Sequence, residues 1–306
     1  MSETGKPILV IGSINMDLVA KTPRIPSAGE TLIGTDFVTT PGGKGANQAV
    51  AAARLGASVS ILGMVGRDVF GKTLEENLSA ATVNTYAIEH ADGPSGIASI
   101  AVARDGQNSI IVVPGANGRV DIDYLDRHAG LISAAGIVLC QLELPLDTVL
   151  HALKLCGAAS VPVVLDPAPA APLPDLAWTQ IDWFTPNETE AALYSGENCS
   201  AEEAAARLLA RGLQGVILKR GETGSYIATR DGRAEWVPAF AVNAVDTVAA
   251  GDCFNGAFAV ALLEGLDPRA AARFASAAAA ISVTRHGAQV SMPLRTEVDD
   301  FLKRRG

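Results

Sequence analysis

Residues 246–256 read DTVAAGDCFNG, a loop of small side chains that leads into an apolar helix predicted at Cys253–Glu264. The first N–H groups of a helix have no partner inside it, and the helix dipole makes that end attractive to anions. The small side chains of Ala249–Gly251 leave room for a phosphate to approach this backbone closely. The stretch therefore predicts an anion-binding turn at the start of a helix.

Asp252 follows this turn directly. The helix dipole would keep its carboxylate ionised, and an ionised carboxylate beside a phosphate can take a proton from an attacking hydroxyl. The alternative is an ordinary helix cap, because Asp is a common N-cap residue after a glycine turn. These residues alone leave both interpretations open.

Two further segments carry polar side chains next to glycines. In residues 42–48 (GGKGANQ), Lys44 and Asn47 are three apart and share one face of the helix that begins there. Asn15 and Asp17 follow the first strand and, two apart, point to the same side. Amide, carboxylate and ammonium groups without an aromatic cage suit a polyhydroxylated ligand. We expect these segments to meet at the carboxyl ends of the strands, where open α/β sheets bind ligands.

Short apolar runs alternate with helical segments along most of the chain. Strands that are apolar throughout and separated by helices indicate a parallel sheet covered on both faces, and hence an α/β fold. We predict strands at Pro7–Ile11, Val59–Val65, Ile137–Leu139, Val161–Leu165 and Val216–Leu218. We predict helices at Asn47–Leu55, Lys72–Ala81, Asp147–Cys156, Ala201–Arg211 and Ala270–Ala280.

One part of the chain departs from this alternation. Ile97–Ala103 and Ser109–Val113 flank a turn and predict a β-hairpin, and the segment after the first strand is also extended. We therefore predict a single α/β domain of residues 1–306 with a small inserted β-lid, formed by about residues 16–41 and 95–115.

Composition excludes several classes of function. The 306 residues include 24 Lys and Arg against 33 Asp and Glu, a net charge of −9 without a basic cluster, so nucleic acid and anionic membranes are poor partners. The longest stretch without a charged residue, His128–Leu142, is too short to span a membrane, and Met1–Pro7 does not resemble a secretory signal. Four widely spaced cysteines without a C-x-x-C pair predict reduced, buried thiols and a cytoplasmic location: Cys140, Cys156, Cys199 and Cys253.

A second candidate for phosphate binding is the stretch GRDVFGKT at 66–73, which matches the phosphate-loop pattern G-x-x-x-x-G-K-[ST] between a strand and a helix. Its bulky Val69 and Phe70 stand where such a loop must wrap phosphates closely. Pro162 also interrupts the run 161–166, which otherwise resembles the partner metal-binding strand. A P-loop phosphotransferase therefore stays a remote alternative.

Two weaker segments could lie near a nucleotide. Residues 185–190 (TPNETE) precede a helical run, and Glu190 is either a capping-box acid or, beside a nucleotide, a holder of hydrated Mg²⁺. Residues 218–224 (LKRGETG) have the composition of a hairpin turn.

Taken together, residues 12–17, 42–49, 185–190 and 246–252 resemble the signature segments of the ribokinase-like (phosphofructokinase-B type) family of sugar kinases, and the resemblance extends from Gly12 to Gln289. It implies a mostly parallel sheet between helices with a β-lid that often builds a homodimer. It also implies ATP-dependent phosphorylation of D-ribose at the 5-hydroxyl, with Mg²⁺ and an activating K⁺. The alternatives are a related kinase of deoxyribose, fructose or a nucleoside, and a non-catalytic sugar-binding regulator.

The resemblance also implies roles for individual residues. Asp252 is the base, and the backbone of Ala249, Ala250 and Gly251 is the anion hole. Sugar-contacting positions are Asn15, Asp17, Gly43, Lys44, Gly45, Asn47 and Glu143, together with Asp252. Nucleotide positions are Asn187, Lys219, Gly221, Gly224, Gly251 and Ser276, and Glu190 would reach Mg²⁺ through water. A monovalent-cation loop, largely of main-chain oxygens, would comprise Asp246, Val248, Ser282, Arg285, Gly287 and Ser291.

Three residues depart from the family pattern. Cys253 stands where Thr is frequent, a small change of size. Ser276 replaces a His that is common near the adenine. Lys219 stands where Thr is frequent and would bring an extra positive charge toward the nucleotide phosphates.

Overall fold

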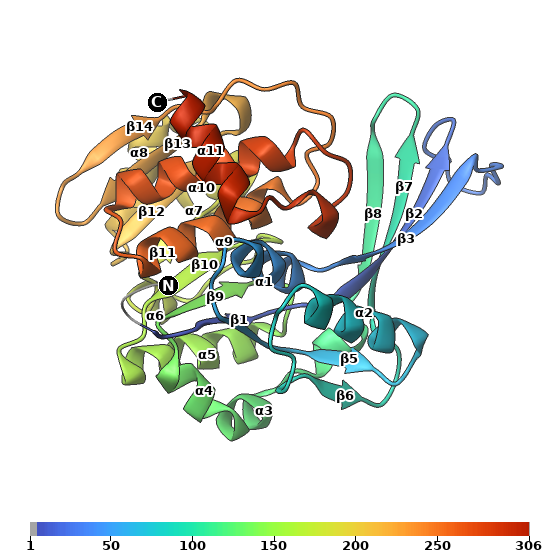
Figure 1. Cartoon of the computed structure of the whole chain (residues 1–306), viewed down its shortest axis with the longest axis horizontal. Coiled ribbons are helices and arrows are strands. Elements are labelled where there is room, and N and C mark those ends of the chain that lie inside the picture. The colour runs from blue at the N-terminus through green and yellow to red at the C-terminus, as the bar shows by residue number, and fades with distance from the viewer. Residues whose placement is uncertain (1–4, 306) are drawn as a thin grey trace.

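The structure is a computed structural model that describes residues 5–305 of the chain (Figure 1). A large sheet lies between two layers of helices, and a smaller sheet projects from one side of this body (Figure 1). The α/β fold class expected from the sequence, with a mostly parallel central sheet and a small second sheet, is confirmed.

The large sheet has eight strands, and those from β4 to β12 are parallel to their neighbours. β13 and β14 extend one edge as antiparallel strands; β13 follows the hairpin turn expected at residues 218–224, whereas the sequence did not indicate β14. In sheet order the strands are β14 (Ala234–Val237), β13 (Ser225–Thr229), β12 (Gly215–Lys219), β11 (Trp183–Phe184), β10 (Val163–Asp166), β9 (Ile137–Gln141), β1 (Ile8–Ile11) and β4 (Val59–Leu62).

Alternate residues of these strands pack into two separate cores, one on each face of the sheet. The helices of the first face are α1 (Lys44–Arg54), α2 (Val69–Ala80), α9 (Ala250–Leu263), α10 (Pro268–Ser282) and α11 (Arg295–Arg305). The second face carries α3 (Ile122–Arg127), α4 (Ala129–Ala134), α5 (Leu146–Ala159), α6 (Asp175–Trp178), α7 (Glu188–Ser195) and α8 (Ala201–Leu209). Single-turn 3₁₀ helices lie at Gly115–Arg119, Gly221–Thr223 and Gln289–Ser291.

The smaller sheet, called here the lid sheet, has four strands in the order β3–β2–β7–β8. The predicted hairpin is confirmed as β7 (Gly96–Ala103) paired with β8 (Asn108–Val113). β2 (Asn15–Thr22) pairs with both β3 (Asp36–Gly42) and β7, so the start of β2 links the lid sheet to the body.

One predicted strand, Val59–Val65, is wrong as a single element. The chain leaves the large sheet at Gly63, and the second half becomes β5 (Met64–Gly66), which pairs with β6 (Glu89–Ala91) in a two-stranded sheet. A continuous apolar run indicates that a strand is buried, but it does not indicate with which other strand it pairs.

Three helices begin three residues earlier than predicted: α1 at Lys44, α2 at Val69 and α9 at Ala250. Both α1 and α9 follow a residue with positive φ, 88° at Gly43 and 58° at Ala249. Helical periodicity cannot reveal such a start, because the first turn carries no apolar repeat. The other predicted ends lie within a few residues of the observed ones, and β10 begins only after Pro162.

The four cysteines are free thiols, as expected, although Cys199 is half-buried whereas the others are buried. Within residues 5–305, no helix combines the length and apolar character that crossing a bilayer requires.

Candidate active site

Asp252 lies in the first turn of α9 and is 5% exposed. Its carboxylate does not cap the helix, because the N-cap residue is Ala249. It instead accepts hydrogen bonds from Asn47 Nδ2 at 2.9 Å and Gln48 Nε2 at 3.1 Å. Burial raises the pKa of Asp252, while the Lys44 ammonium acts against this rise. The N-cap interpretation is therefore wrong, and α1 holds Asp252 as a buried, hydrogen-bonded acid.

The turn before Asp252 presents backbone N–H groups. The N–H of Ala250 donates to the Thr247 carbonyl at 3.3 Å, so it already has an acceptor. The next two groups, on Gly251 and Asp252, belong to the first helical turn and have no acceptor within the helix. Space beside Gly251 is open, since the nearest atom to an added Cβ is Lys219 Nζ at 3.5 Å. These two N–H groups, rather than the whole run from Ala249, can bind an anion.

Close backbone contact positions α1 against α9. A Cβ on Gly256 would lie 2.8 Å from both the Ala51 Cβ and the Gln48 carbonyl oxygen. Glycine at 256 therefore lets the two helices approach until α1 side chains reach Asp252. At the start of α1, a Cβ on Gly45 would lie 2.6 Å from the carbonyl carbon of Gly12, which follows β1, so Gly45 is a spacing residue between α1 and this segment.

Glu143 gathers several predicted sugar-binding residues. Its Oε2 accepts from Ser13 Oγ at 2.5 Å, from the Lys44 backbone N–H at 3.3 Å and from Asn15 Nδ2 at 3.5 Å. Asn15 Oδ1 in turn accepts from Asn117 Nδ2 at 2.7 Å. The structure thus brings Asn15, Lys44 and Glu143 together beyond the ends of β1 and β9.

Asp17 belongs to the same group of charges. Its pKa is raised from 3.8 to about 7, first by burial and then by the negative charges of Glu143 and Asp252. Gly42 faces it, and a Cβ there would come within 2.2 Å of the Asp17 carboxylate. Burial alone would lower the pKa of Lys44, but the surrounding carboxylates, Asp252 foremost, outweigh it and raise that pKa. In this polar cluster, therefore, acids surround one ammonium.

The predicted nucleotide residues lie at the other side of the anion turn. Gly221 is in the 3₁₀ turn Gly221–Thr223 between β12 and β13, so the predicted hairpin turn is confirmed. Gly224 has φ 105°, and a Cβ there would lie 2.2 Å from the Val237 carbonyl oxygen. Asn187 pairs with Lys219 in a parallel bridge, and Ser276 is half-buried in α10, which packs on α9.

Glu190 forms the capping box that was one of its two interpretations. Its oxygens accept from the Asn187 N–H at 2.8 Å and Asn187 Nδ2 at 2.9 Å. Burial raises the pKa of Glu190, whereas the nearby Lys219 charge opposes this and Asp166 adds to it. The cap therefore directs Glu190 toward the same charged cluster as Lys219 and Asp166.

Asp246 connects two of the other predicted monovalent-cation residues, Val248 and Gly287. Its carboxylate accepts from the N–H groups of Val248 at 3.0 Å and Gly287 at 2.9 Å, and its own N–H donates to the Val283 carbonyl at 3.1 Å. The Arg285 side chain is paired with Glu297. Ser282 and Ser291 each donate their hydroxyl to a backbone carbonyl. Across the described residues, no three His, Cys, Asp or Glu side chains are grouped so as to hold a metal ion by themselves.

Sequence reasoning missed the residues that connect these parts. Gln48 Nε2 donates to Asp252 and also, at 3.0 Å, to Asp166 Oδ2. Gln48 Oε1 accepts from Gln141 Nε2 at 2.8 Å, and Asp166 Oδ1 is 3.0 Å from Lys219 Nζ. The available signal was position, because Gln141 and Asp166 are polar residues that end buried parallel strands.

The second phosphate-loop candidate, residues 66–73, is a helix cap. Asp68 Oδ1 accepts from the Gly71 N–H at 2.8 Å, so an amide that a phosphate would need is already bonded. The Lys72 side chain is 79% exposed and 3.7 Å from Glu76. This corner has no inward-facing lysine, and the P-loop alternative is therefore wrong.

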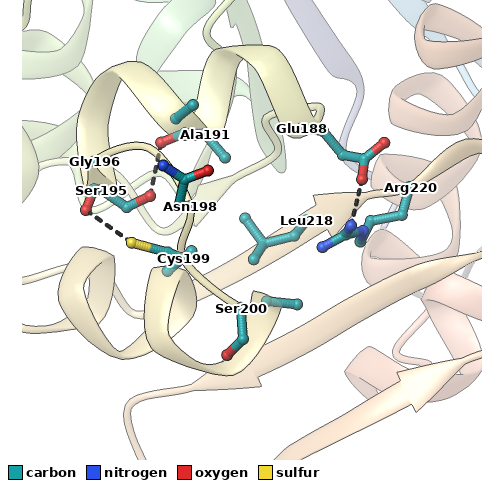
Figure 2. A pocket seen from close by; sticks show the side chains of 12 residues that line it. Glu188, Ala191, Ser195, Gly196, Asn198, Cys199, Ser200, Leu218 and Arg220 are labelled. Carbon is teal, nitrogen blue, oxygen red and sulfur yellow. Dashed lines mark hydrogen bonds and ion pairs between the residues drawn. The ribbon is translucent and has the colours of Figure 1, made fainter.

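A pocket of about 160 Å³ lies between α7, α8 and the end of β12, and Figure 2 shows the side chains that line it. It is lined by Leu218, and its mouth carries the ion pair between Glu188 and Arg220 (Figure 2). Leu218 and Lys219 are consecutive in β12 and point to opposite faces of the sheet. The pocket is therefore separate from the cluster around Asp252.

Comparison with known proteins agrees with this geometry. Residues 6–295 match the pfkB family carbohydrate kinase. The ribokinase of Bacillus subtilis is 45% identical over 302 residues, with 96% of this chain and 99% of that protein covered. The deoxyribokinase of Salmonella typhi is 40% identical over 301 residues, covering 96% and 98%.

Solved structures give the same result. A ribokinase from Thermotoga maritima superposes with a TM-score of 0.91 at 40% identity, covering 97% of this chain and 99% of that one. An Arabidopsis thaliana ribokinase complexed with ribose and ATP superposes with a TM-score of 0.92 at 35% identity, with the same coverage. Fold, site geometry and full-length similarity lead to one conclusion: this chain belongs to the pfkB family of carbohydrate kinases.

Proposed function

We propose that the protein is an ATP-dependent kinase that phosphorylates D-ribose at its 5-hydroxyl. The observation that carries this proposal is the buried carboxylate of Asp252, placed beside two backbone N–H groups with no helical acceptor. A base next to an anion site is the arrangement that phosphoryl transfer to a hydroxyl requires. Ribokinases from several organisms are 40–45% identical to the chain, which supports ribose as the acceptor.

Asp252 takes the proton of the sugar 5-hydroxyl as its oxygen attacks the γ-phosphorus. The O5–P bond forms, the bond from phosphorus to the β,γ-bridging oxygen breaks, and ADP leaves with that electron pair. The N–H groups of Gly251 and Asp252 stabilise the charge on the transferred group. A raised pKa makes Asp252 a better proton acceptor than an exposed carboxylate once it is ionised.

Sugar recognition is proposed to use the polar cluster around Glu143. Asn15 and Lys44 offer N–H donors, and Asp17 can accept from two neighbouring hydroxyls at once. Asn47 keeps its amide nitrogen on Asp252, so it orients the base as well as bordering the sugar. Gly43 and Gly45 let the start of α1 pack directly on the backbone of residues 12–15, and their own backbone is proposed to border the sugar.

The nucleotide is proposed to lie across the turn at Gly221, with Gly224, Asn187, Gly251 and Ser276 around it. Glu190 fits a water-mediated Mg²⁺, because oxygen ligands suit this ion and its carboxylate lies in the field of the charged cluster. When bound, Mg²⁺ neutralises charge on the ATP phosphates.

A monovalent cation is proposed to bind at the loop that Asp246 holds together. Carbonyl and hydroxyl oxygens there are the hard ligands that such an ion prefers. The residues proposed for it are Asp246, Val248, Ser282, Arg285, Gly287 and Ser291, the arginine through its main chain.

The lid sheet is proposed to form a homodimer. β8 exposes a continuous apolar run, in which Ile111 is 65% exposed, and Phe37 on β3 is 61% exposed. Exposed apolar surface of this kind on both edge strands of the lid sheet suits a second copy of the same chain. Sedimentation equilibrium should show a dimer for the wild type and a monomer for Ile111→Glu.

The function is tested by measuring ATP consumption with ribose, 2-deoxyribose, fructose and nucleosides. We expect ribose to give the highest kcat/KM, and ³¹P NMR should place the phosphate on O5. Deoxyribose is the second candidate, because deoxyribokinases cover the chain at 40% identity. A nucleoside as the best substrate would overturn the proposal.

A further inference from the structure

Lys219 borders the anion turn from the nucleotide side. It is the last residue of β12, and its Nζ lies 3.5 Å from the position that a Cβ on Gly251 would occupy. Its side chain is 15% exposed. A largely buried ammonium thus stands beside the two N–H groups that can bind an anion.

Asp166 holds this ammonium in place. Its Oδ1 lies 3.0 Å from Lys219 Nζ, and the Asp166 side chain is only 3% exposed. An ammonium has three N–H donors, and Asp166 accepts one of them, which leaves donor capacity directed at the turn. A buried ion pair contributes little to stability by itself, because desolvation offsets the attraction of the charges.

The same aspartate is connected to the base. The Gln48 amide nitrogen donates to Asp166 at 3.0 Å and to Asp252 at 3.1 Å. Gln141 donates to the Gln48 oxygen at 2.8 Å, and this contact fixes which end of the amide faces the two carboxylates. Base, amide, carboxylate and ammonium therefore form one continuous chain of hydrogen bonds across the anion turn.

We propose that Lys219 is a catalytic residue that contacts the ATP phosphates during transfer, and that Asp166 is the residue that positions it. This inference rests on the proposed kinase function and extends it. Lys219 donates hydrogen bonds to phosphate oxygens and keeps its protons, while the proton of the sugar hydroxyl goes to Asp252. A fixed cation beside the phosphorus stabilises the charge that develops on the transferred group and on ADP.

The first test compares Lys219→Met with the wild type. We expect kcat with ribose to fall about 10–100-fold, since Lys44 and the backbone N–H groups remain. Isothermal titration should show ATP binding weakened by about 10-fold. Adenosine, which has no phosphate, should bind with unchanged affinity. Lys219→Arg, which keeps the charge, should recover part of the ATP affinity.

A purely structural role predicts a different pattern. Lys219→Met leaves Asp166 buried without its counter-ion, so the loss in activity could come from that charge. The double variant Lys219→Met/Asp166→Asn removes both charges and should recover thermal stability. We expect its kcat and ATP affinity to stay low. Recovery of both to within three-fold of the wild type would show that Lys219 serves only as a counter-ion, and the proposal would be wrong.

Lys154→Met is the matched control, because it removes the same charge from an exposed position on α5, on the other face of the sheet. It should leave kcat and ATP binding unchanged. The experiment distinguishes a failure of the proposed kinase function from a failure of the proposed role of Lys219. A wild type that neither binds ATP nor phosphorylates a sugar contradicts the kinase function, whereas an active wild type with an equally active Lys219→Met contradicts only the role of Lys219.

Discussion

Two turns of this protein each lead into a helix, and we call them the first and second corner. The key side chain of the first corner is buried, whereas that of the second is exposed to solvent. Residues 246–256 and 66–73 both lead into a helix through glycine and small or polar residues, and only the second matches a known phosphate-loop pattern. In the structure, Asp252 of the first corner is buried against α1, whereas Lys72 of the second is 79% exposed. The sequence motif therefore indicates a loop before a helix, and the neighbouring helices and strands decide whether that loop can form a catalytic site.

The most direct test of this difference is to replace the aspartate of each corner, Asp252 in the first and Asp68 in the second. Asp252→Asn removes the proton acceptor and keeps the shape, so we expect kcat to fall by about 10²–10⁴-fold with ATP binding largely intact. Asp68→Asn should leave kcat within about two-fold and cost roughly 1 kcal/mol in stability, because an amide nitrogen would replace one of the two carboxylate oxygens that accept from Ser95. Steady-state kinetics and thermal unfolding measure both. More than a tenth of wild-type turnover in Asp252→Asn would remove this residue from the mechanism.

The second prediction concerns Asp17, one of the acidic residues near Asp252 in the first corner. If Asp17 accepts from the 2-hydroxyl, 2-deoxyribose leaves a buried acceptor partly unpaired, at a cost of ~1–3 kcal/mol. We expect kcat/KM for 2-deoxyribose to be about 10–100-fold below that for ribose. Asp17→Ala should weaken ribose use and narrow this gap. An unchanged ratio, or a wild type that prefers deoxyribose, would contradict the role of Asp17.

The third prediction concerns the loop that abuts the first corner. Asp246 ties residues 246–248 to Gly287, so a cation bound there should order the anion turn. We expect several-fold higher activity in K⁺ than in Na⁺ or tetramethylammonium at equal ionic strength. Equal rates in the three salts would show that the loop does not act through an ion.

The fourth prediction uses the raised pKa of Asp17. Because burial and the charges of Glu143 and Asp252 raise it to about 7, the sugar-free protein should lose stability as the pH rises from about 4 to about 7. The shift corresponds to at most about 4 kcal/mol, and partial exposure of Asp17 reduces it to ~1–2 kcal/mol. Asp17→Asn should therefore unfold at a higher temperature than the wild type at pH 8, and at nearly the same temperature at pH 4. Equal differences at both pH values would contradict the shift.

The smallest effect is expected at the second corner. Lys72→Ala removes an exposed side chain whose contact is with Glu76, so kcat and KM should stay within about two-fold of the wild type. Loss of activity in a folded Lys72→Ala protein would revive the phosphate-loop interpretation.

Much of the fold was predictable because its signals are local. The apolar runs from Ile8 and from Val216 indicated buried parallel strands, and the hairpin around residues 104–107 followed from its turn. The break at Gly63 and the antiparallel edge strand β14 were not predictable, because both depend on which strand lies beside them.

The candidate active site was likewise only partly predictable from the sequence. Glycines, small residues and single acids near strand ends were enough to predict Asp252, Asn15 and Glu143 as members of one site, with the help of a family resemblance. The chain of contacts through Gln48, Gln141 and Asp166 was not predictable. These residues are far apart along the chain and meet only because β9, β10 and β12 lie near one another in the sheet.

By itself, the sequence determined the alternation of strands and helices, the turn of small residues before α9 and the family to which the chain belongs, since each is recorded in side chains within a few residues of one another. The tertiary structure decided that Asp252 is a buried acid and not a cap, that Lys72 faces solvent, and that Lys219 reaches Gly251. Burial and electrostatic environment depend on neighbours contributed by distant segments, and strand order and helix packing bring those segments together.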